Sequence, residues 1–531
     1  MGFCTFYFPS FWRSDLFSAR GRLRSCNRKL LSCHPSSLSL VLSLPLSDEV
    51  AAIVGDVGSH TSKFGYAGED LPKHVFDTIV GFVPGAAEAS PEGAAAGIAA
   101  AVTGRAEGQH LVGDDISFLQ TREGLELRSP LVDGLVADWD ALERVWRHGF
   151  RRMSTQPSAH PILAAEASWS SRPQRQRLMQ LMFESFDVPA LYVAKTGTLA
   201  AFSAGRATAL VCDCGHSSLA VVPVVDGYVL NKGIQRSARG GDWLTHQALE
   251  HLTKTGPVVP RYAARLRRGG PGGRPAGSSA KSCSGGGGSS SGGGSNGGAA
   301  GAAAAIAGKV LLGVHPSFAT YAINEVAQDL KEGWMMVPPR DKEDAAEALS
   351  DFAEDFEQPD YELPDGTKVV VAPVVIRTPE VIFDSKATGA AAAAAGSAAG
   401  TAAAAGGGAV SGTAGGSSAQ QQRALDLPLQ QLVHAALAAS DADARREMCG
   451  NMLLSGGSSL FPGMPERLAE EAARLLPSAL RVKVLAPQER RFAAWVGGSI
   501  LATLGTFQQL WLSRAEYNEL GPDAAQDRFG G

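Results

Sequence analysis

The chain has 531 residues, 44% of them hydrophobic, and a formal net charge of −5 at pH 7. This length can hold two or more domains with a substantial core, and so mild a charge excludes bulk electrostatic binding of nucleic acid. The 7 cysteines are scattered and form no CxxC pair, which argues against a disulfide framework or a structural zinc site and favours a reducing compartment.

The first 48 residues differ in composition from the rest of the chain. They are rich in arginine and serine, and Asp15 is the one acidic residue before Asp48. We interpret residues 1–48 as a disordered or mispredicted leader, and an organelle transit peptide is the alternative. The apolar stretch at 38–46 is too short to span a bilayer, so no membrane partner is expected.

Three segments are low in complexity: 85–108, 265–308 and 386–422. They consist largely of Ala, Gly and Ser, and they cannot bury enough apolar surface to offset the entropy of ordering. We therefore expect flexible insertions on the surface.

Strand-like and helix-like segments alternate between these insertions. Strands are expected at 51–54, 191–194, 210–212, 219–225, 368–375 and 452–454. Helices are expected at 139–150, 172–186, 241–252, 322–332, 427–438 and 465–476. This alternation predicts an α/β protein with mixed sheets.

The first strand runs into a turn that contains Asp56, Gly58, Ser59 and Lys63. A glycine lets backbone N–H groups approach a phosphate, a carboxylate can hold a cation or its water shell, and a lysine adds a point charge. The spacing is not that of a Walker A loop. In isolation, a plain β-hairpin turn would be the simpler interpretation.

The same layout returns about 157 residues later, at Asp213 and Gly215, a spacing that fits two similar domains. Two such turns facing each other predict a nucleotide site. A divalent cation would be held there, through water, by Asp56 and Asp213.

A third turn, Gly456-Gly457, follows the strand at 452–454 and leads through Phe461 to the helix at 465–476. A double glycine lets backbone lie against a flat ring or a ribose phosphate near a positive helix terminus. A linker turn is the alternative interpretation.

Several longer segments resemble the actin family: 66–73, 181–184, 188–193, 361–366, 495–502 and 507–511. The resemblance covers about 49–262 and 309–525, in order. It implies the actin-like ATPase fold, an α/β fold with two related ribonuclease-H-like domains around a nucleotide cleft for ATP and Mg²⁺ or Ca²⁺. The implied domains are 49–195 and 196–490, with 491–531 returning to the first.

Further segments resemble the nuclear branch of actin-related proteins: 59–63, 66–70, 129–134, 138–140, 194–196 and 481–485. Conventional actins have a glutamine where this chain has Thr196, a second aspartate where it has His216, and a subunit-gripping loop where it has residues 85–108. Thr196 is short for orienting an attacking water, and an imidazole is a poor partner for Mg²⁺. We therefore expect ATP binding with weak or absent hydrolysis, and no catalytic residue is assigned.

The resemblance also assigns the adenosine side of the cleft. It implies that Lys331 and Glu332 contact adenosine, that Gly456, Gly457 and Phe461 line the adenine side, and that Arg491 replaces a lysine near the base. Without the resemblance, Lys331 and Glu332 would be interpreted as a solvated helix end.

The function implied is that of a nuclear, partly cytoplasmic, ATP-binding and non-catalytic subunit of chromatin-remodelling and histone-acetyltransferase complexes. The expected partners are actin, a helical segment of a remodeller ATPase subunit, other subunits and, indirectly, nucleosomes or histones. The helical segment would lie in an apolar groove near Phe202, although core packing is the alternative for the residues Ile500, Leu501, Leu504 and Phe507.

Two other functions remain as alternatives. One is a polymerising cytoskeletal actin-like ATPase. The other is an ATP-dependent enzyme such as a sugar kinase, which would need a carboxylate general base that the sequence does not reveal.

Overall fold

The computed structural model describes residues 51–82, 111–117, 124–268, 314–338, 360–370, 378–384 and 427–529. The expected leader and the insertions at 85–108 and 386–422 lie outside these ranges, as does the insertion at 265–308 apart from its first four residues. The strand expected at 368–375 is described only to residue 370.

The first of two main sheets has the strand order β19-β10-β9-β1-β2-β3. Its strands are β1 (Ile53–Val57), β2 (Thr61–Tyr66), β3 (His74–Asp77), β9 (Ile162–Glu166), β10 (Ala190–Lys195) and β19 (Leu512–Ser513). β1 and β2 form an antiparallel hairpin, whereas β9 lies parallel to β1 and to β10. The last strand of the chain, β19, thus completes a sheet made otherwise from the first half.

The second main sheet has the order β13-β12-β11-β17-β18, with β14 paired to β12. Its strands are β11 (Ala209–Cys214), β12 (Leu219–Val225), β13 (Tyr228–Val229), β14 (Gln235–Ser237), β17 (Met452–Ser455) and β18 (Val484–Leu485). β11 and β12 form an antiparallel hairpin, and β17 lies parallel to β11. Its central strands therefore repeat the arrangement of β1, β2 and β9.

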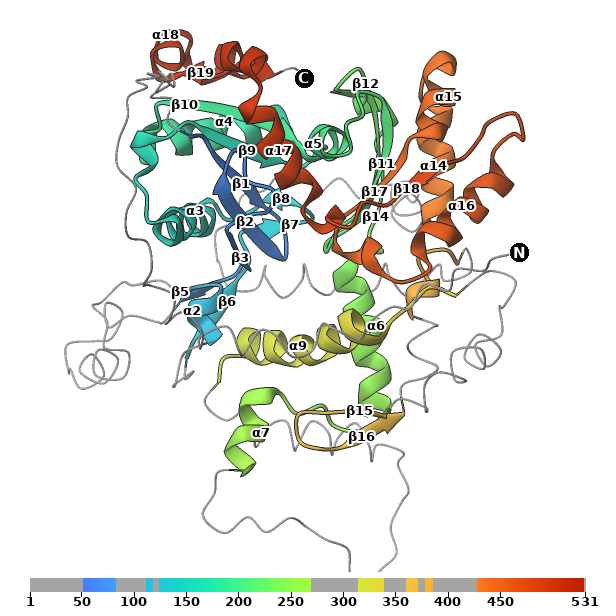
Figure 1. Ribbon diagram of the computed structural model, residues 1–531. Helices are drawn as coiled ribbons and strands as arrows, with labels where there is room; N and C mark the ends of the chain where they lie inside the picture. Colours follow the sequence, from blue (N-terminus) through green and yellow to red (C-terminus); the bar gives the residue numbers. More distant parts are fainter. Residues whose placement is uncertain are drawn as a thin grey trace, which may run out of the picture. The chain divides into compact units, whose positions relative to one another are not determined.

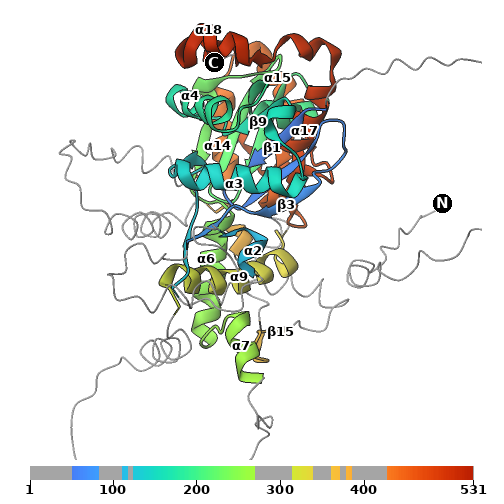
Figure 2. The same ribbon diagram turned by 90° about the vertical axis from the view of Figure 1, so that its left-hand side faces the viewer.

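Most helices pack on these sheets, and α6, α7 and α9 form a smaller helical region (Figure 1). The helices are α2 (Asp114–Ser117), α3 (Trp139–Met153), α4 (Arg172–Gln180), α5 (Thr196–Ser203), α6 (Gly241–Thr255), α7 (Arg261–Arg268), α9 (Pro316–Trp334), α14 (Leu429–Ala438), α15 (Ala442–Gly450), α16 (Met464–Leu475), α17 (Ala493–Thr503) and α18 (Arg514–Ala525). Figures 1 and 2 both place α6, α7 and α9 together, at the opposite end of the fold from α18.

Short elements complete the described fold. Small sheets are formed by β4 (Val80–Phe82), β5 (Leu111–Val112) and β6 (Glu126–Arg128), by β7 (Leu131–Val132) and β8 (Leu135–Val136), and by β15 (Asp360–Glu362) and β16 (Lys368–Val370). 3-10 turns cover Pro157–Ala159, Asn231–Gly233, Gly457–Leu460, Arg490–Phe492, Gly505–Gln509 and Gln526–Phe529.

The helix expected at 172–186 is interrupted. α4 ends at Gln180, and a π-helical turn, Leu181–Ser185, follows it. The wider turn holds one more residue than an α-turn, and within it the adjacent Met182 and Phe183 are both buried in the core. The other helices expected within the described residues are present, with ends shifted by a few residues.

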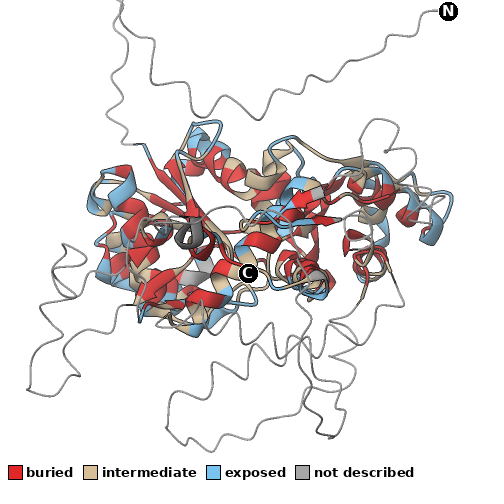
Figure 3. Cartoon of the chain, turned by 90° about the horizontal axis from the view of Figure 1, so that it is seen from below, coloured by how far each residue is buried: buried red, intermediate tan, exposed pale blue. Residues whose placement is uncertain are grey.

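α5 and α17 pack between the two sheets. α17 joins a cluster with Val54 and Leu163 of the first sheet, and α5 joins one with Val211 and Val222 of the second. Gly497 allows this close pairing, because a Cβ there would lie 1.8 Å from the carbonyl oxygen of Leu199. The central strands and the helix faces turned toward them are buried (Figure 3).

Candidate functional site

Both Asp-x-Gly turns have the same local hydrogen bond. The N–H of Gly58 donates to the carbonyl of Thr61 at 3.2 Å, and the N–H of Gly215 donates to the carbonyl of Ser218 at 3.1 Å. Each turn closes a hairpin at the end of a central strand, so each presents its following two side chains in the same way.

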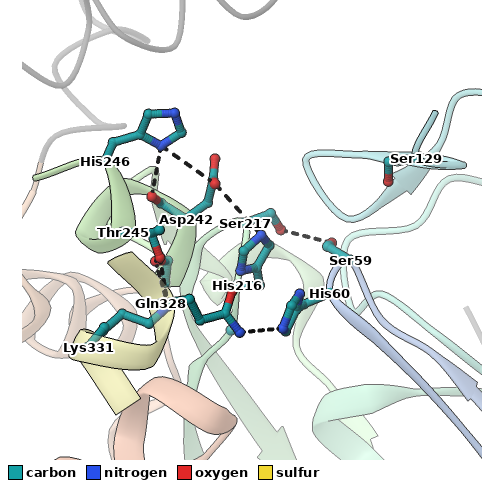
Figure 4. Close-up of polar contacts among 12 residues, drawn as sticks. Ser59, His60, Ser129, His216, Ser217, Asp242, Thr245, His246, Gln328 and Lys331 are labelled. Carbon is teal, nitrogen blue, oxygen red and sulfur yellow. Dashed lines mark hydrogen bonds and ion pairs between the residues drawn. The ribbon is translucent and has the colours of Figure 1, made fainter. Parts of the chain in front are cut away.

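The two turns contact each other directly (Figure 4). Ser59 donates through its hydroxyl to the hydroxyl of Ser217 at 3.2 Å. The rings of His60 and His216 stack with their centroids 4.8 Å apart and an interplanar angle of 23°. In both contacts, the residue directly after one turn glycine meets the residue two positions after the other.

The second turn is also held by the start of α6. The N–H of Gly241 donates to the carbonyl of Gly215 at 2.9 Å, and the N–H of Asp242 donates to that of His216 at 2.8 Å. These helix N–H groups have no partner within their own helix, and they position the turn instead.

Two carboxylates lie at the base of the turns. Asp56 accepts a hydrogen bond at 2.9 Å from Lys63, its cross-strand partner, and both side chains are buried. The pKa of Asp213 is raised to about 6, first by burial and then by the charge of Asp56, against the opposite effect of Lys63. The surroundings of Asp213 therefore disfavour its ionised form, and a bound cation would favour it.

Lys331 is the most unexpected of the predicted residues, because only 5% of it is exposed. Its ammonium donates to the carbonyl of Gly241 at 3.0 Å and to the hydroxyl of Thr245 at 2.9 Å (Figure 4). Burial lowers its pKa to about 8. Interpreting Lys331 as a solvated helix end is therefore wrong, whereas Glu332 beside it is exposed and accepts a hydrogen bond from Gln328.

The double glycine lies directly against the second turn. Gly456 has a φ of +86°, and a Cβ there would lie 2.4 Å from the carbonyl oxygen of Cys214 and 2.8 Å from a carboxylate oxygen of Asp213. Ser458 donates to the carbonyl of Gly215 at 3.3 Å. Glycine is required at 456 both by its backbone conformation and by this close approach.

Thr196 begins α5, and its hydroxyl lies 3.2 Å from that of Ser168. His216 is half-buried, and desolvation followed by the neighbouring His60 lowers its pKa well below the ordinary value. Both side chains face the same cavity.

This cavity has a volume of about 390 Å³, within the range of small-molecule sites. It brings together every residue that the sequence assigned to the site: Asp56, Gly58, Ser59, Lys63, Thr196, Asp213, Gly215, His216, Lys331, Glu332, Gly456, Gly457, Phe461 and Arg491. Their roles in holding a nucleotide stay predictions, as does the assignment of a metal to Asp56 and Asp213.

The donor set fits a nucleotide with its cation. Two acidic side chains, backbone N–H groups at both turns and Lys63 suit a polyphosphate and a hard cation. In the ranges that the structure describes, no three His, Cys, Asp or Glu side chains form a metal cluster. A cation would therefore take its other ligands from phosphate oxygens and water.

Sequence reasoning assigned no role to His60 and did not identify Gln328. The side-chain amide nitrogen of Gln328 lies 2.6 Å from a ring nitrogen of His60, which ties α9 to the first turn. The signal for His60 was available, because a histidine lies within two positions after the turn glycine in both copies. Gln328 carries no comparable signal, since it lies one helical turn before Glu332 on an ordinary polar face.

Among the described residues, every helix is too short or too polar to cross a bilayer. In that same part of the chain, the cysteines Cys212, Cys214 and Cys449 are buried free thiols.

Comparison with known proteins identifies the family. The profile of the family described as Actin matches residues 47–530. Actin-related protein 4 of Oryza sativa subsp. indica is 34% identical over 491 residues, covering 89% of this chain and 97% of the relative. Actin-related protein 4 of Arabidopsis thaliana is 31% identical over 491 residues, covering 90% of this chain and 98% of the relative.

These matches confirm the family, the similarity to actin-related protein 4 and the actin-like ATPase fold that the sequence motifs predicted. The two sheets with their repeated hairpins agree with that fold. The chain therefore belongs to the actin family, as an actin-related protein similar to actin-related protein 4.

Proposed function

We propose that this protein binds ATP with Mg²⁺ or Ca²⁺ as a structural ligand and acts as a non-catalytic nuclear subunit of chromatin-remodelling and histone-acetyltransferase complexes. The observation that carries the ATP-binding part is the single cavity lined by both Asp-x-Gly turns, the double glycine and buried Lys331. The similarity to actin-related protein 4 supports the choice of function.

Weak hydrolysis follows from what faces the phosphate end of the cavity. Thr196 hydrogen-bonds with Ser168, and His216 stacks on His60. Neither side chain is a carboxamide or a carboxylate, the groups that would orient an attacking water. Binding without turnover is the expected outcome.

The proposed partner surface is the apolar groove beside α17. Leu501 and Phe507 are buried core residues, whereas Ile500 and Leu504 are 41% and 42% exposed. Ile500 lies on α17 and Leu504 directly follows its last residue, and exposed apolar side chains placed together in this way can receive the apolar face of a partner helix. The occupant that we propose is a helical segment of a remodeller ATPase subunit, with actin as the neighbouring subunit.

Three measurements test this function. Titration of the full chain with MgATP should show saturable binding, and release of inorganic phosphate should stay at background. Affinity purification from nuclear extract should recover actin and a remodeller ATPase subunit. Ile500→Asp with Leu504→Asp should abolish their recovery, while Leu520→Asp, at another exposed apolar position, should not.

The polymerising alternative makes the opposite predictions. Sedimentation of filaments after Mg²⁺ and salt are added, with rapid phosphate release, would replace our proposal by a cytoskeletal ATPase. Recovery of neither actin nor a remodeller subunit would remove the assembly part of the proposal and leave the nucleotide part to the titration.

A further inference from the structure

The stacked pair of His60 and His216 occupies the point where the two phosphate-facing turns meet (Figure 4). Each ring comes from a different hairpin, and both line the cavity. The neighbouring Ser59–Ser217 hydrogen bond keeps the two turns in contact. Polyphosphate bound by both turns would therefore lie within reach of two imidazoles.

We propose that His60 and His216 are ligands of the polyphosphate, and that they bind it as imidazolium groups that take up protons when the nucleotide enters. This inference rests on the proposed nucleotide binding and names the phosphate ligands and the pH regulation of that site.

The surroundings of both rings favour the neutral form. Burial lowers the pKa of His60, and Lys331 and Arg491 act in the same direction, while Asp77 and Glu332 oppose them. Burial also lowers the pKa of His216, together with His60, Lys331 and His246. Two stacked rings cannot both be charged at low cost, because like charges at this short distance repel.

The polar neighbours of the two rings each lie against one ring nitrogen. His60 has one ring nitrogen 2.6 Å from the side-chain amide nitrogen of Gln328, so protonation of that ring nitrogen requires the amide to turn and present its oxygen. His216 has one ring nitrogen 3.8 Å from the carboxylate of Asp242, which would stabilise a protonated ring. Each ring thus has a second nitrogen that a phosphate oxygen can contact.

A polyphosphate reverses this electrostatic balance. Its several negative charges between the two turns favour the protonated form of both rings. Charge-assisted hydrogen bonds from imidazolium to phosphate are stronger than those from a neutral ring. The free energy of binding is therefore coupled to proton uptake, and affinity must rise as the pH falls.

The test is calorimetric titration of the full chain with MgATP at pH 7.2 in two buffers of different ionisation enthalpy, such as PIPES and Tris. The difference in apparent enthalpy counts the protons exchanged. We expect net uptake by the wild type, and a binding constant that rises about tenfold per pH unit for each proton taken up.

His60→Gln and His216→Gln should each reduce the proton count and weaken binding, whereas His434→Gln, at an exposed position on α14, should change neither. The nucleotide's own protonation is common to all variants and cancels in the comparison. The wild-type proton count needs no variant, so it tests the inference even where a substitution impairs folding.

Saturable binding with no proton uptake, or with the same uptake in both histidine variants as in the wild type, would overturn this inference and leave the proposed nucleotide site intact. Tighter binding after removal of either ring would show that the pair obstructs the site, and would overturn it too. Absence of any binding by the wild type would overturn the proposed function along with it.

Discussion

Replacing Asp213 with asparagine should stabilise the protein and at the same time remove its response to nucleotide. The side chain is half-buried, and desolvation followed by the charge of Asp56 raises its pKa from the usual 3.8 to about 6. A carboxyl group whose pKa is higher in the folded state imposes no penalty below pH 3.8. The penalty grows through the window between the two values and is complete above pH 6.

The magnitude follows from the size of that shift. One pKa unit corresponds to about 1.4 kcal/mol, so the ionised Asp213 costs the folded protein about 3 kcal/mol at pH 7.5. Asparagine has nearly the same shape and no charge. We therefore expect Asp213→Asn to raise the free energy of unfolding by up to about 3 kcal/mol in the absence of nucleotide.

Nucleotide should reverse the order of stability of the wild type and the variant. A ligand at a hundred times its dissociation constant stabilises its target by about 2.7 kcal/mol, and the wild type should gain this with MgATP. The variant should gain little, since it lacks the carboxylate that would hold the cation's water shell.

The assay is thermal and urea unfolding at pH 7.5, with and without MgATP. Asp70→Asn is the matched control, because Asp70 is exposed on a turn and the same atoms change there. A variant less stable than the wild type without nucleotide would refute the electrostatic reasoning. A variant with an undiminished response to MgATP would refute the placement of Asp213 in the site.

Three further predictions concern other buried groups. His148→Gln should reduce the loss of stability on acidification, because burial lowers the pKa of His148 from 6.5 to about 4. In urea unfolding, the free energy of unfolding of the wild type should fall by about 2 kcal/mol between pH 7 and pH 5. Equal losses in both proteins would contradict this. Lys331→Met should weaken MgATP binding about 10- to 100-fold, and wild-type affinity should fall above pH 8 as Lys331 loses its proton; the same pH profile in the variant would assign the effect to another group. Gly497→Ala should lower the free energy of unfolding by about 3 kcal/mol or more, because the added carbon forces α17 away from α5. Gly505→Ala, where no atom lies within 4 Å of the added carbon, should change the free energy of unfolding little. Similar unfolding of both variants would show that the two helices can separate at little cost.

The sequence was sufficient for features that local pattern encodes. Three features fall in this class: the hairpin turns at Asp56 and Asp213 and the double glycine at 456. Each consists of a few consecutive residues whose types, together with the strand before them, can be recognised in the sequence. Motif resemblance then supplied the order in which these pieces are assembled, including the residues that now line one cavity.

Other features depend on contacts between distant segments and could not be predicted. The burial of Lys331 arises because α9 packs against the start of α6, where Gly241 and Thr245 accept its hydrogen bonds. The stacking of His60 on His216 requires the two hairpins to face each other at a distance that no single-segment periodicity encodes. In each case the tertiary neighbour, and not the local propensity, determines the environment.

The route by which the C-terminal segment returns to the first sheet has a consequence for synthesis. The indole of Trp495 donates to the carbonyl of Val54 at 3.1 Å across a separation of 441 residues. The hydroxyl of Ser499 accepts from the N–H of Gly68 and donates to the carbonyl of Glu69. At the usual elongation rates, roughly 20 to 90 s pass between emergence of the two partners from the ribosome. Throughout that interval the apolar residues on which α17 packs, such as Val54 and Leu163, are exposed. Newly made chains should therefore bind holdase chaperones until translation ends.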